Sequence, residues 1–148
     1  MALEKLHIIL ADDDADDREI FELAISQIDI ATTFSTFKNG MEVISYLRSP
    51  QPRLPALLFL DLNMPYMDGL ECLDQIRKDP GLEHLTVVIY STSASEKDIE
   101  ATFMGGANVY INKPSDFEVL KKVLKKVLTL DWHYHTSILN RENFLFRF

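Results

Sequence analysis

Residues with the chemistry to bind metal and phosphate stand at four places where a short apolar run ends. These places are the acidic triplet Asp12–Asp14, then Asp61, Ser91 and Lys113. Carboxylates that lie together repel one another and raise one another's pKa unless a cation intervenes. A lysine ammonium and a serine hydroxyl can bind the oxygens of an anion. If the four places meet in space, they form a site with a divalent cation on one side and a phosphoryl group on the other.

Five short apolar runs alternate with five helical patterns along the chain, and together they define the elements that must position these residues. The predicted strands cover residues 7–11, 32–37, 56–60, 86–90 and 109–111. The predicted helices cover residues 14–28, 41–48, 69–78, 95–104 and 116–129, because their apolar residues recur at helical spacing. Three prolines within residues 50–55 place a surface loop before the third strand.

Strands that are each followed by a helix predict an α/β fold with a doubly wound, five-stranded parallel sheet and helices on both faces. The run at residues 56–60 is apolar at every position, as expected for a central strand covered on both faces. Such folds place their functional site at the carboxyl ends of the strands. We therefore expect Asp12, Asp13, Asp61, Ser91 and Lys113 to converge on one cleft. The carboxylate oxygens of the aspartates are hard ligands, and such ligands favour Mg²⁺.

Four motifs, each following its own predicted strand, resemble the receiver domains of two-component response regulators. They are Ile9–Asp14, Leu60–Gly69, Ile89–Ser93 and Tyr110–Pro114, and they occur in the order typical of the family. The resemblance covers about residues 5 to 129. It implies a flavodoxin-like receiver fold and a phosphorylation-dependent signalling switch.

The resemblance also implies roles for the acceptor and the metal ligands. Asp61 would be the nucleophile that becomes an aspartyl phosphate. Asp13 and Asp61 would ligate Mg²⁺ directly, and Asp12 would act largely through water. Asn63 would offer its backbone carbonyl to the metal.

Further roles carried over by the resemblance concern the anion and the switch. Ser91 and Lys113 would each bind a phosphoryl oxygen, and Tyr110 would be the switch aromatic whose ring turns inward as Ser91 moves. The Lys113–Pro114 bond is expected to be cis. Thr92 stands where the family usually has a small residue, so access to the acceptor is expected to differ.

By the same resemblance, the phosphoryl donor would be the phosphohistidine of a sensor histidine kinase or a phosphotransfer protein. The chain would not be an enzyme beyond its own phosphoryl transfer and autodephosphorylation. We expect the receiver-like region to act without an output domain of its own, so a separate downstream protein is expected to read the signal.

Three other functions compete with this interpretation. An aspartate-nucleophile phosphohydrolase usually has a second acid-base aspartate two residues after the nucleophile, where this chain has Asn63. A degenerate, unphosphorylated interaction module would not need the complete set of acids found here. A flavodoxin-like cofactor binder is disfavoured because no glycine-rich phosphate-binding fingerprint is present.

Several of these residues also have structural interpretations. Asp14 is read first as the N-cap of the helix that follows it, and Asp68–Gly69 as turn chemistry. Tyr110 could be a tyrosine at the edge of the core. The lysines between residues 121 and 126 form a solvated helix face or, alternatively, a contact surface for an acidic partner.

The composition bounds the class of protein. The chain has 148 residues and a net charge of -8, which argues against nucleic-acid or anionic-membrane binding. Its single cysteine, Cys72, excludes an intrachain disulfide, and no apolar stretch approaches the ~20 residues of a membrane span. The N-terminus does not match a signal peptide. We expect a cytoplasmic protein.

We assign residues 1–129 to the receiver domain and residues 130–148 to a C-terminal extension, called the tail below. The tail carries nine large apolar residues in nineteen positions, so it should be buried somewhere rather than solvated. They are Leu130, Trp132, Tyr134, Ile138, Leu139, Phe144, Leu145, Phe146 and Phe148. The tail could fold back on its own domain or form a homodimer, and self-association is the first hypothesis because the domain's core is complete without it.

Overall fold

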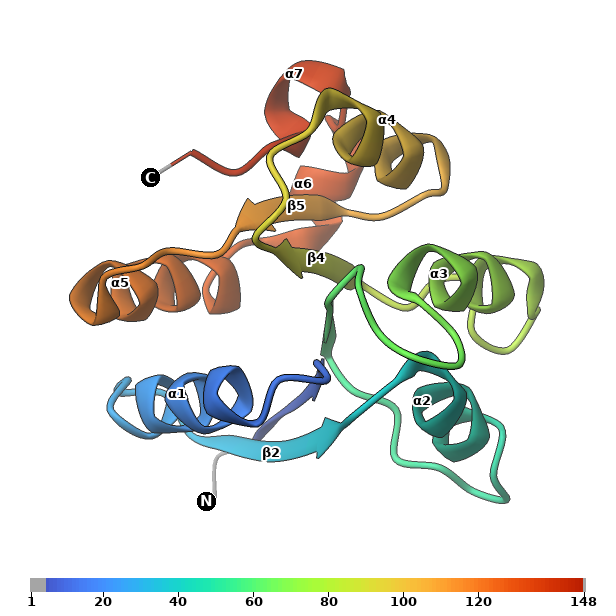
Figure 1. Cartoon of the computed structure of the whole chain (residues 1–148), viewed down its shortest axis with the longest axis horizontal. Helices are drawn as coiled ribbons and strands as arrows, with labels where there is room; N and C mark the ends of the chain where they lie inside the picture. The colour runs from blue at the N-terminus through green and yellow to red at the C-terminus, as the bar shows by residue number, and fades with distance from the viewer. Residues whose placement is uncertain (1–4, 148) are drawn as a thin grey trace.

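A five-stranded parallel sheet with strand order β2-β1-β3-β4-β5 forms the centre of the molecule, as predicted (Figure 1). The computed structural model describes residues 5–147. The strands are β1 Leu6–Ala11, β2 Thr32–Phe37, β3 Leu57–Leu60, β4 Val87–Ser91 and β5 Val109–Asn112. They match the predicted runs to within one residue at each end.

Five helices cover the two faces of this sheet. One face carries α1 Ala15–Ser26 and α5 Phe117–Leu128, and the other carries α2 Gly40–Leu47, α3 Gly69–Lys78 and α4 Glu96–Met104 (Figure 1). The predicted helices are confirmed, with ends that differ by at most two residues. The largest difference is at α1, which ends at Ser26 rather than at Ile28 because Gln27 caps it.

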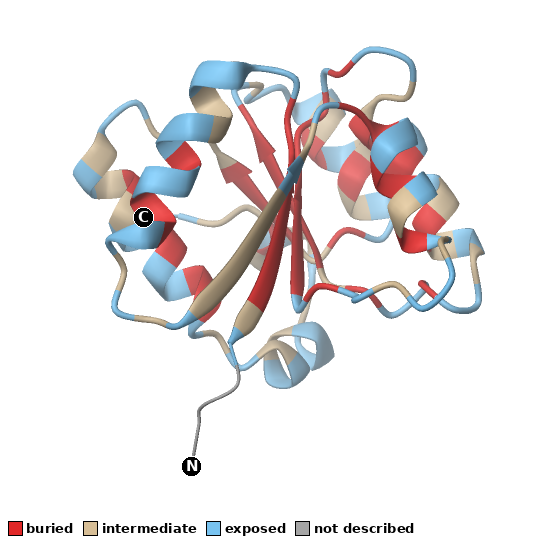
Figure 2. Ribbon diagram, turned by 90° about the horizontal axis from the view of Figure 1, so that it is seen from below, coloured by how far each residue is buried: buried red, intermediate tan, exposed pale blue. Residues whose placement is uncertain are grey.

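The strands contribute apolar side chains to two separate cores, one on each face of the sheet (Figure 2). In β1, Ile8 belongs to the core under Phe21 of α1, whereas its neighbour Ile9 belongs to the core under Val43 of α2. All four side chains are fully buried. Complete burial of such a side chain contributes roughly 1.5–3 kcal/mol relative to leaving it exposed. Both faces of the central strands are therefore committed to packing, and polar residues are displaced to the strand ends.

Polar side chains define where the helices begin. The Asp14 carboxylate accepts a hydrogen bond from the Asp17 backbone N–H at 3.0 Å, which confirms the predicted N-cap of α1. At α3, Asp68 and Glu71 form a reciprocal capping box. Each cap satisfies donors that a helix start leaves without intrahelical partners. These caps position the loops that follow β1 and β3 at the carboxyl edge of the sheet.

The described part of the tail, residues 130–147, forms two short helices, α6 Trp132–Ser137 and α7 Arg141–Phe144, which the apolar pattern did not predict, and Phe148 lies outside the described residues. Phe144 of α7 is fully buried, with its ring 5.3 Å from Phe103 of α4 and 6.2 Å from Tyr110 of β5. The Phe146 backbone N–H then donates to the Tyr110 carbonyl at 2.8 Å. Of the two destinations considered for the tail, the structure shows docking on its own domain (Figure 1).

Ion pairs add to this docking at the exposed rim of α4. The Arg141 guanidinium contacts Glu96 at 2.7 Å and Glu100 at 2.9 Å. Exposed pairs of this kind are worth little individually, typically 0.2–1 kcal/mol. The burial of Phe144 is therefore the main contribution to docking. No helix among residues 5–147 has the length and apolar character required to cross a membrane.

If Phe144 holds the tail, Phe144→Ala should release it while the sheet stays folded. Removal of a buried phenylalanine typically costs about 3–5 kcal/mol. We expect faster hydrogen exchange at the Phe146 amide, because its bond to the Tyr110 carbonyl breaks when the tail opens. Tyr134→Ala, which alters a tail side chain that is 61% exposed, is the control and should leave that exchange unchanged. Unchanged protection in both variants would show that Phe144 does not hold the tail.

Candidate functional site

Two aspartates lie side by side where adjacent strands end. Asp12 follows β1 and Asp61 follows β3, and the strand register pairs Ala11 with Leu60. The Asp61 N–H also donates to the Ala11 carbonyl at 3.0 Å. Both carboxylates are buried, with relative exposures of 0% for Asp12 and 6% for Asp61. Two acids this deeply buried require a cation or donors nearby.

Lys113 supplies positive charge to this pair from the end of β5. Its ammonium lies 2.8 Å from Asp12 Oδ2 and 3.3 Å from Asp61 Oδ2. The same ammonium stands 5.3 Å from the centre of the Tyr90 ring, and the Lys113 N–H donates to the Ser91 carbonyl at 2.8 Å. The lysine side chain is only 8% exposed. Lys113 is therefore a buried cation fixed by its backbone and by its carboxylate partners, not a solvated surface charge.

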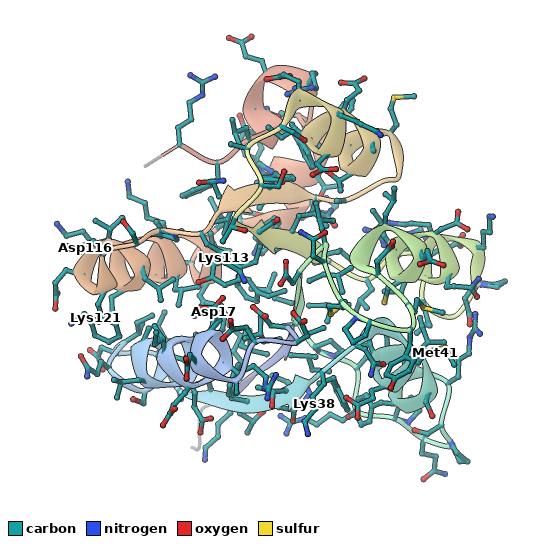
Figure 3. All side chains as sticks on the ribbon, in the orientation of Figure 1. Asp17, Lys38, Met41, Lys113, Asp116 and Lys121 are labelled. Carbon is teal, nitrogen blue, oxygen red and sulfur yellow. The ribbon has the colours of Figure 1, made fainter. Side chains whose placement is uncertain are left out.

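A third carboxylate, Asp17 of α1, contacts the same lysine at 2.9 Å. Figure 3 shows Asp17 on α1 and Lys113 at the end of β5, which faces that helix. From the sequence alone, Asp17 is only a favourable negative charge in the first turn of the helix that Asp14 caps. No local sequence pattern signals its role in the site, since the contact joins residues 96 positions apart.

The acids that were predicted to hold a metal do gather. Single carboxylate oxygens of Asp12, Asp13 and Asp61 all lie within 4.8 Å of one another. Asp12 uses both of its oxygens, since Oδ1 accepts the Asp14 N–H at 3.0 Å and Oδ2 contacts Lys113. Asp13 is exposed, and so is Asn63 in the loop after β3. This set of hard oxygen ligands fits a divalent cation.

Burial sets the protonation behaviour of the acceptor candidate. Loss of solvation raises the pKa of Asp61 to about 6, an increase that the Lys113 charge opposes and the Asp12 charge reinforces. Burial lowers the pKa of Lys113, but its hydrogen bonds to Asp12 and Asp17 and the charges of Asp61 and Asp12 outweigh it, so the net pKa is raised. Lys113 therefore stays protonated, and Asp61 is the group whose pKa depends on the opposing charges of Lys113 and Asp12.

The loop after β3 brings its backbone tightly around Asp61. The Leu62 N–H donates to Asp61 Oδ1 at 2.8 Å, which fixes the direction of the carboxylate. A Cβ atom at position 69 would lie only 2.2 Å from the Asp61 carbonyl oxygen, so Gly69 is the residue that allows this approach. Tyr66, at the tip of the loop, has a left-handed φ of 66°. The predicted turn chemistry at Asp68–Gly69 is corrected to a helix start, because Asp68 is the N-cap of α3 and Gly69 is its first residue.

Ser91 and Tyr110 are linked through the backbone of Ser93. Ser91 is fully buried at the end of β4, and its hydroxyl oxygen accepts the Ser93 N–H at 3.1 Å. The hydroxyl of Tyr110 donates to the Ser93 carbonyl at 2.8 Å, with the tyrosine ring fully buried under Phe144. The backbone of Ser93 is therefore hydrogen-bonded both to the Ser91 hydroxyl at the site and to the Tyr110 hydroxyl, whose ring lies beneath the tail.

The predicted residues meet at one edge of the sheet, with one correction. Asp12, Asp13, Asp61 and Lys113 form a connected cluster, and Ser91 ends the strand between β3 and β5. The predicted cis bond at Lys113–Pro114 is wrong, because every peptide bond within residues 5–147 is trans. The two isomers of a bond before proline differ by only about 0.5–1 kcal/mol, so the local sequence does not decide between them.

A pH-dependent effect of Asp61→Asn follows from the raised pKa of Asp61. The native state binds a proton there more tightly than the unfolded chain, so Asp61 favours folding below pH 3.8 and loses that contribution as pH rises through about 6. In EDTA, Asp61→Asn should therefore stabilise the protein by about 1–3 kcal/mol at pH 7.5.

Urea unfolding at two pH values measures this effect, and the gain should shrink markedly at pH 4.5. Asp16→Asn, which alters an exposed acid of α1, is the control and should change stability by less than about 0.5 kcal/mol at either pH. A gain from Asp61→Asn that is equal at both pH values would contradict the assigned electrostatics.

Comparison with known proteins supports the same interpretation. The family model described as the response regulator receiver domain matches residues 8–125. Among curated relatives, the response regulator Rcp1 of Synechocystis is 28% identical over 125 residues, which cover 81% of this chain and 84% of that protein. A probable methanogenesis regulatory protein, FilR2 of Methanothrix harundinacea, is 28% identical over 123 residues, covering 81% of this chain and 79% of its own.

Solved structures agree in fold. The phosphorylated cyanobacterial phytochrome response regulator RcpA superposes with a TM-score of 0.78 at 32% identity, covering 84% of this chain and 91% of that one. The Mn²⁺-bound form of Rcp1 gives a TM-score of 0.76 at 26% identity, covering 84% and 93%. The chain therefore belongs to the response regulator receiver family and is a phosphorylation-dependent switch of two-component signalling.

Proposed function

We propose that Asp61 is the phosphoryl acceptor of this switch. The observation that carries the proposal is a buried carboxylate at the end of the central strand β3, held between the Leu62 N–H and the Lys113 ammonium. A lone acid at the end of an apolar strand is costly unless it serves a purpose. Its raised pKa of about 6 still leaves it ionised, and hence nucleophilic, at neutral pH.

The covalent step transfers the phosphoryl group from a phosphohistidine to Asp61. An oxygen of the carboxylate attacks phosphorus, the phosphorus–nitrogen bond breaks, and the imidazole leaves with the electron pair and takes up a proton. Ser91 and Lys113 each bind an oxygen of the transferred group. The Ser91 hydroxyl oxygen accepts the Ser93 N–H, and as a hydroxyl the group can also donate its hydrogen to a phosphoryl oxygen.

We propose that Mg²⁺ is the metal of the site. Asp13 and Asp61 would hold it directly, Asp12 through water, and Asn63 through its backbone carbonyl. The exposed Asp13 and the separations below 4.8 Å among the three carboxylates support this assignment. When bound, the cation supplies positive charge that offsets the carboxylates and the phosphoryl oxygens.

Tyr110 is the proposed reporter of the phosphorylated state. Recruitment of the Ser91 hydroxyl by the phosphoryl group would alter the segment that ends at Ser93, which accepts the hydrogen bond of Tyr110. The ring in turn contacts Phe144 of α7. A shift between two arrangements of this segment would change the surface that partners contact. The binding free energy of a partner would then differ between the two states by roughly 1–3 kcal/mol.

The proposed donor is a sensor histidine kinase or a phosphotransfer protein, and the proposed receiver of the signal is a separate protein. The chain acts chemically only on itself, through phosphoryl transfer and autodephosphorylation. We place it in the cytoplasm. A reducing compartment is acceptable for the single, buried Cys72, whose pKa burial raises to about 12.

Treatment with acetyl phosphate and Mg²⁺ tests the acceptor. Intact mass should rise by one phosphoryl unit, and Asp61→Asn should abolish the gain because the nucleophile is lost. Asp74→Asn, which alters an exposed acid of α3, should label like the parent protein. Half-maximal labelling of Asp13→Ala should require at least about tenfold more Mg²⁺ than that of the parent, because a metal ligand is lost. Undiminished labelling of Asp61→Asn, or full labelling in EDTA, would contradict the proposal.

We also propose that the tail can support a homodimer. Phe144 is buried within its own domain, but Tyr134 and Ile138 of the same tail remain 61% and 44% exposed. Tyr134→Ser combined with Ile138→Ser should shift any dimer to monomer in light scattering while leaving Asp61 labelling intact. Tyr66→Ser, which alters an exposed aromatic residue of another loop, is the control. If the parent is monomeric in both phosphorylation states, the dimer proposal fails and the tail acts only on its own domain.

A further inference from the structure

The ammonium of Lys113 is already fully engaged in the unphosphorylated site. It has three N–H donors, and three carboxylate oxygens lie around it. Asp12 is at 2.8 Å, Asp17 at 2.9 Å and Asp61 at 3.3 Å. The longest of the three contacts is the one to the proposed acceptor. A phosphoryl oxygen that binds Lys113 must therefore displace or share one of the existing contacts.

The three carboxylates differ in how readily they can release the lysine. The side chain of Asp12 is 0% exposed and that of Asp61 is 9% exposed, whereas that of Asp17 is 36% exposed. An exposed carboxylate that loses its partner is rehydrated at small cost, but a buried one is left as an uncompensated charge. Asp17 is therefore the contact that the lysine can exchange most easily.

The surroundings of Asp17 allow such an exchange. A surface pocket of about 380 Å³ opens beside the lysine and is lined in part by Asp17, Tyr90, Thr92 and Lys113. Water can thus reach the carboxylate of Asp17 from the side. Meanwhile its backbone N–H is bonded to the Asp14 carboxylate, so the start of α1 keeps Asp17 within reach of Lys113 (Figure 3).

We infer that Asp17 is a positioning residue that competes with the phosphoryl group on Asp61 for Lys113, and thereby weakens the hold of the site on that group. The inference rests on the proposed function of Asp61 and adds a residue that sets the affinity of the site for the phosphoryl group. With Asp17 as counter-ion, the lysine is drawn toward α1. When the phosphoryl group arrives, the lysine transfers one donor from Asp17 to a phosphoryl oxygen, and Asp17 becomes hydrated.

The test measures affinity for beryllium fluoride, an anion with the shape of a phosphoryl group, by calorimetry at saturating Mg²⁺. Asp17→Asn keeps the shape of the side chain but removes its charge, and Asp17→Ala removes the acceptor altogether. Both should bind the probe about two- to fivefold more tightly than the parent, the range expected for loss of one partly exposed ion pair. A structure of Asp17→Asn should also show the Lys113–Asp61 distance shortened from 3.3 Å.

Two matched variants separate competition from a general change in charge. Asp16→Asn removes the same charge from the neighbouring, exposed position on α1 and should bind the probe like the parent. Asp17→Glu retains the charge and should restore parental affinity at least in part. Equal affinities for Asp17→Asn, Asp16→Asn and the parent, or weaker binding by Asp17→Asn, would overturn the inference.

The parent protein distinguishes this inference from the proposed function. If the parent neither binds beryllium fluoride nor becomes labelled on Asp61, the proposed function itself fails, and the inference fails with it. If the parent does both and the Asp17 variants behave like it, only the competition for Lys113 is refuted. Folding of each variant is checked by its thermal unfolding curve, and the partly exposed position of Asp17 predicts little change.

Discussion

The interaction on which this structure depends is the contact of one lysine ammonium with three carboxylates at the carboxyl edge of the sheet. Asp12 and Asp61 are buried side by side at the ends of adjacent strands, where their charges oppose each other. Lys113 lies within 3.3 Å of both and of Asp17 as well. Removing the lysine would leave the buried carboxylates without their cation, which is far more costly than the net worth of one ion pair. One ammonium does not neutralise three carboxylates, so the site keeps an excess of negative charge that a divalent cation can offset, and an added negative charge must redistribute the contacts around Lys113.

This dependence suits a switch. A phosphoryl group adds negative charge at the point where the lysine is already shared, so the contacts around it must be redistributed. The change has a physical route outward, because Ser91, Ser93, Tyr110 and Phe144 form an unbroken series of hydrogen bonds and ring contacts. That series ends at the tail, which lies on α4 and β5. We propose that phosphorylation at the site alters the packing of the tail through these contacts.

Much of this arrangement was predictable because it depends on local patterns. Strands apolar on both faces alternate with amphipathic helices, and this alternation alone predicts a parallel sheet whose strand ends meet. Asp12, Asp61 and Lys113 could be assigned to one cluster for that reason, and the structure confirms it. The cap at Asp14 and the tight loop at Gly69 were also readable, since a helix start and a close backbone approach each require particular residue types.

By itself, the sequence determined the fold through its hydrophobic periodicity and the clustering of Asp12, Asp61 and Lys113 through their places at strand ends, while four motifs supplied the resemblance to the family. Tertiary structure alone decided the rest. Asp17 and Lys113 are 96 residues apart, and only the packing of α1 against α5, the helix that follows Lys113 in the chain, brings them within 2.9 Å. The aromatic content of the tail required burial but did not say where, and the docking of Phe144 on Phe103 and Tyr110 depends on the surface that α4 and β5 together present. Local patterns do not encode such pairings, because their energy exists only once distant elements have packed.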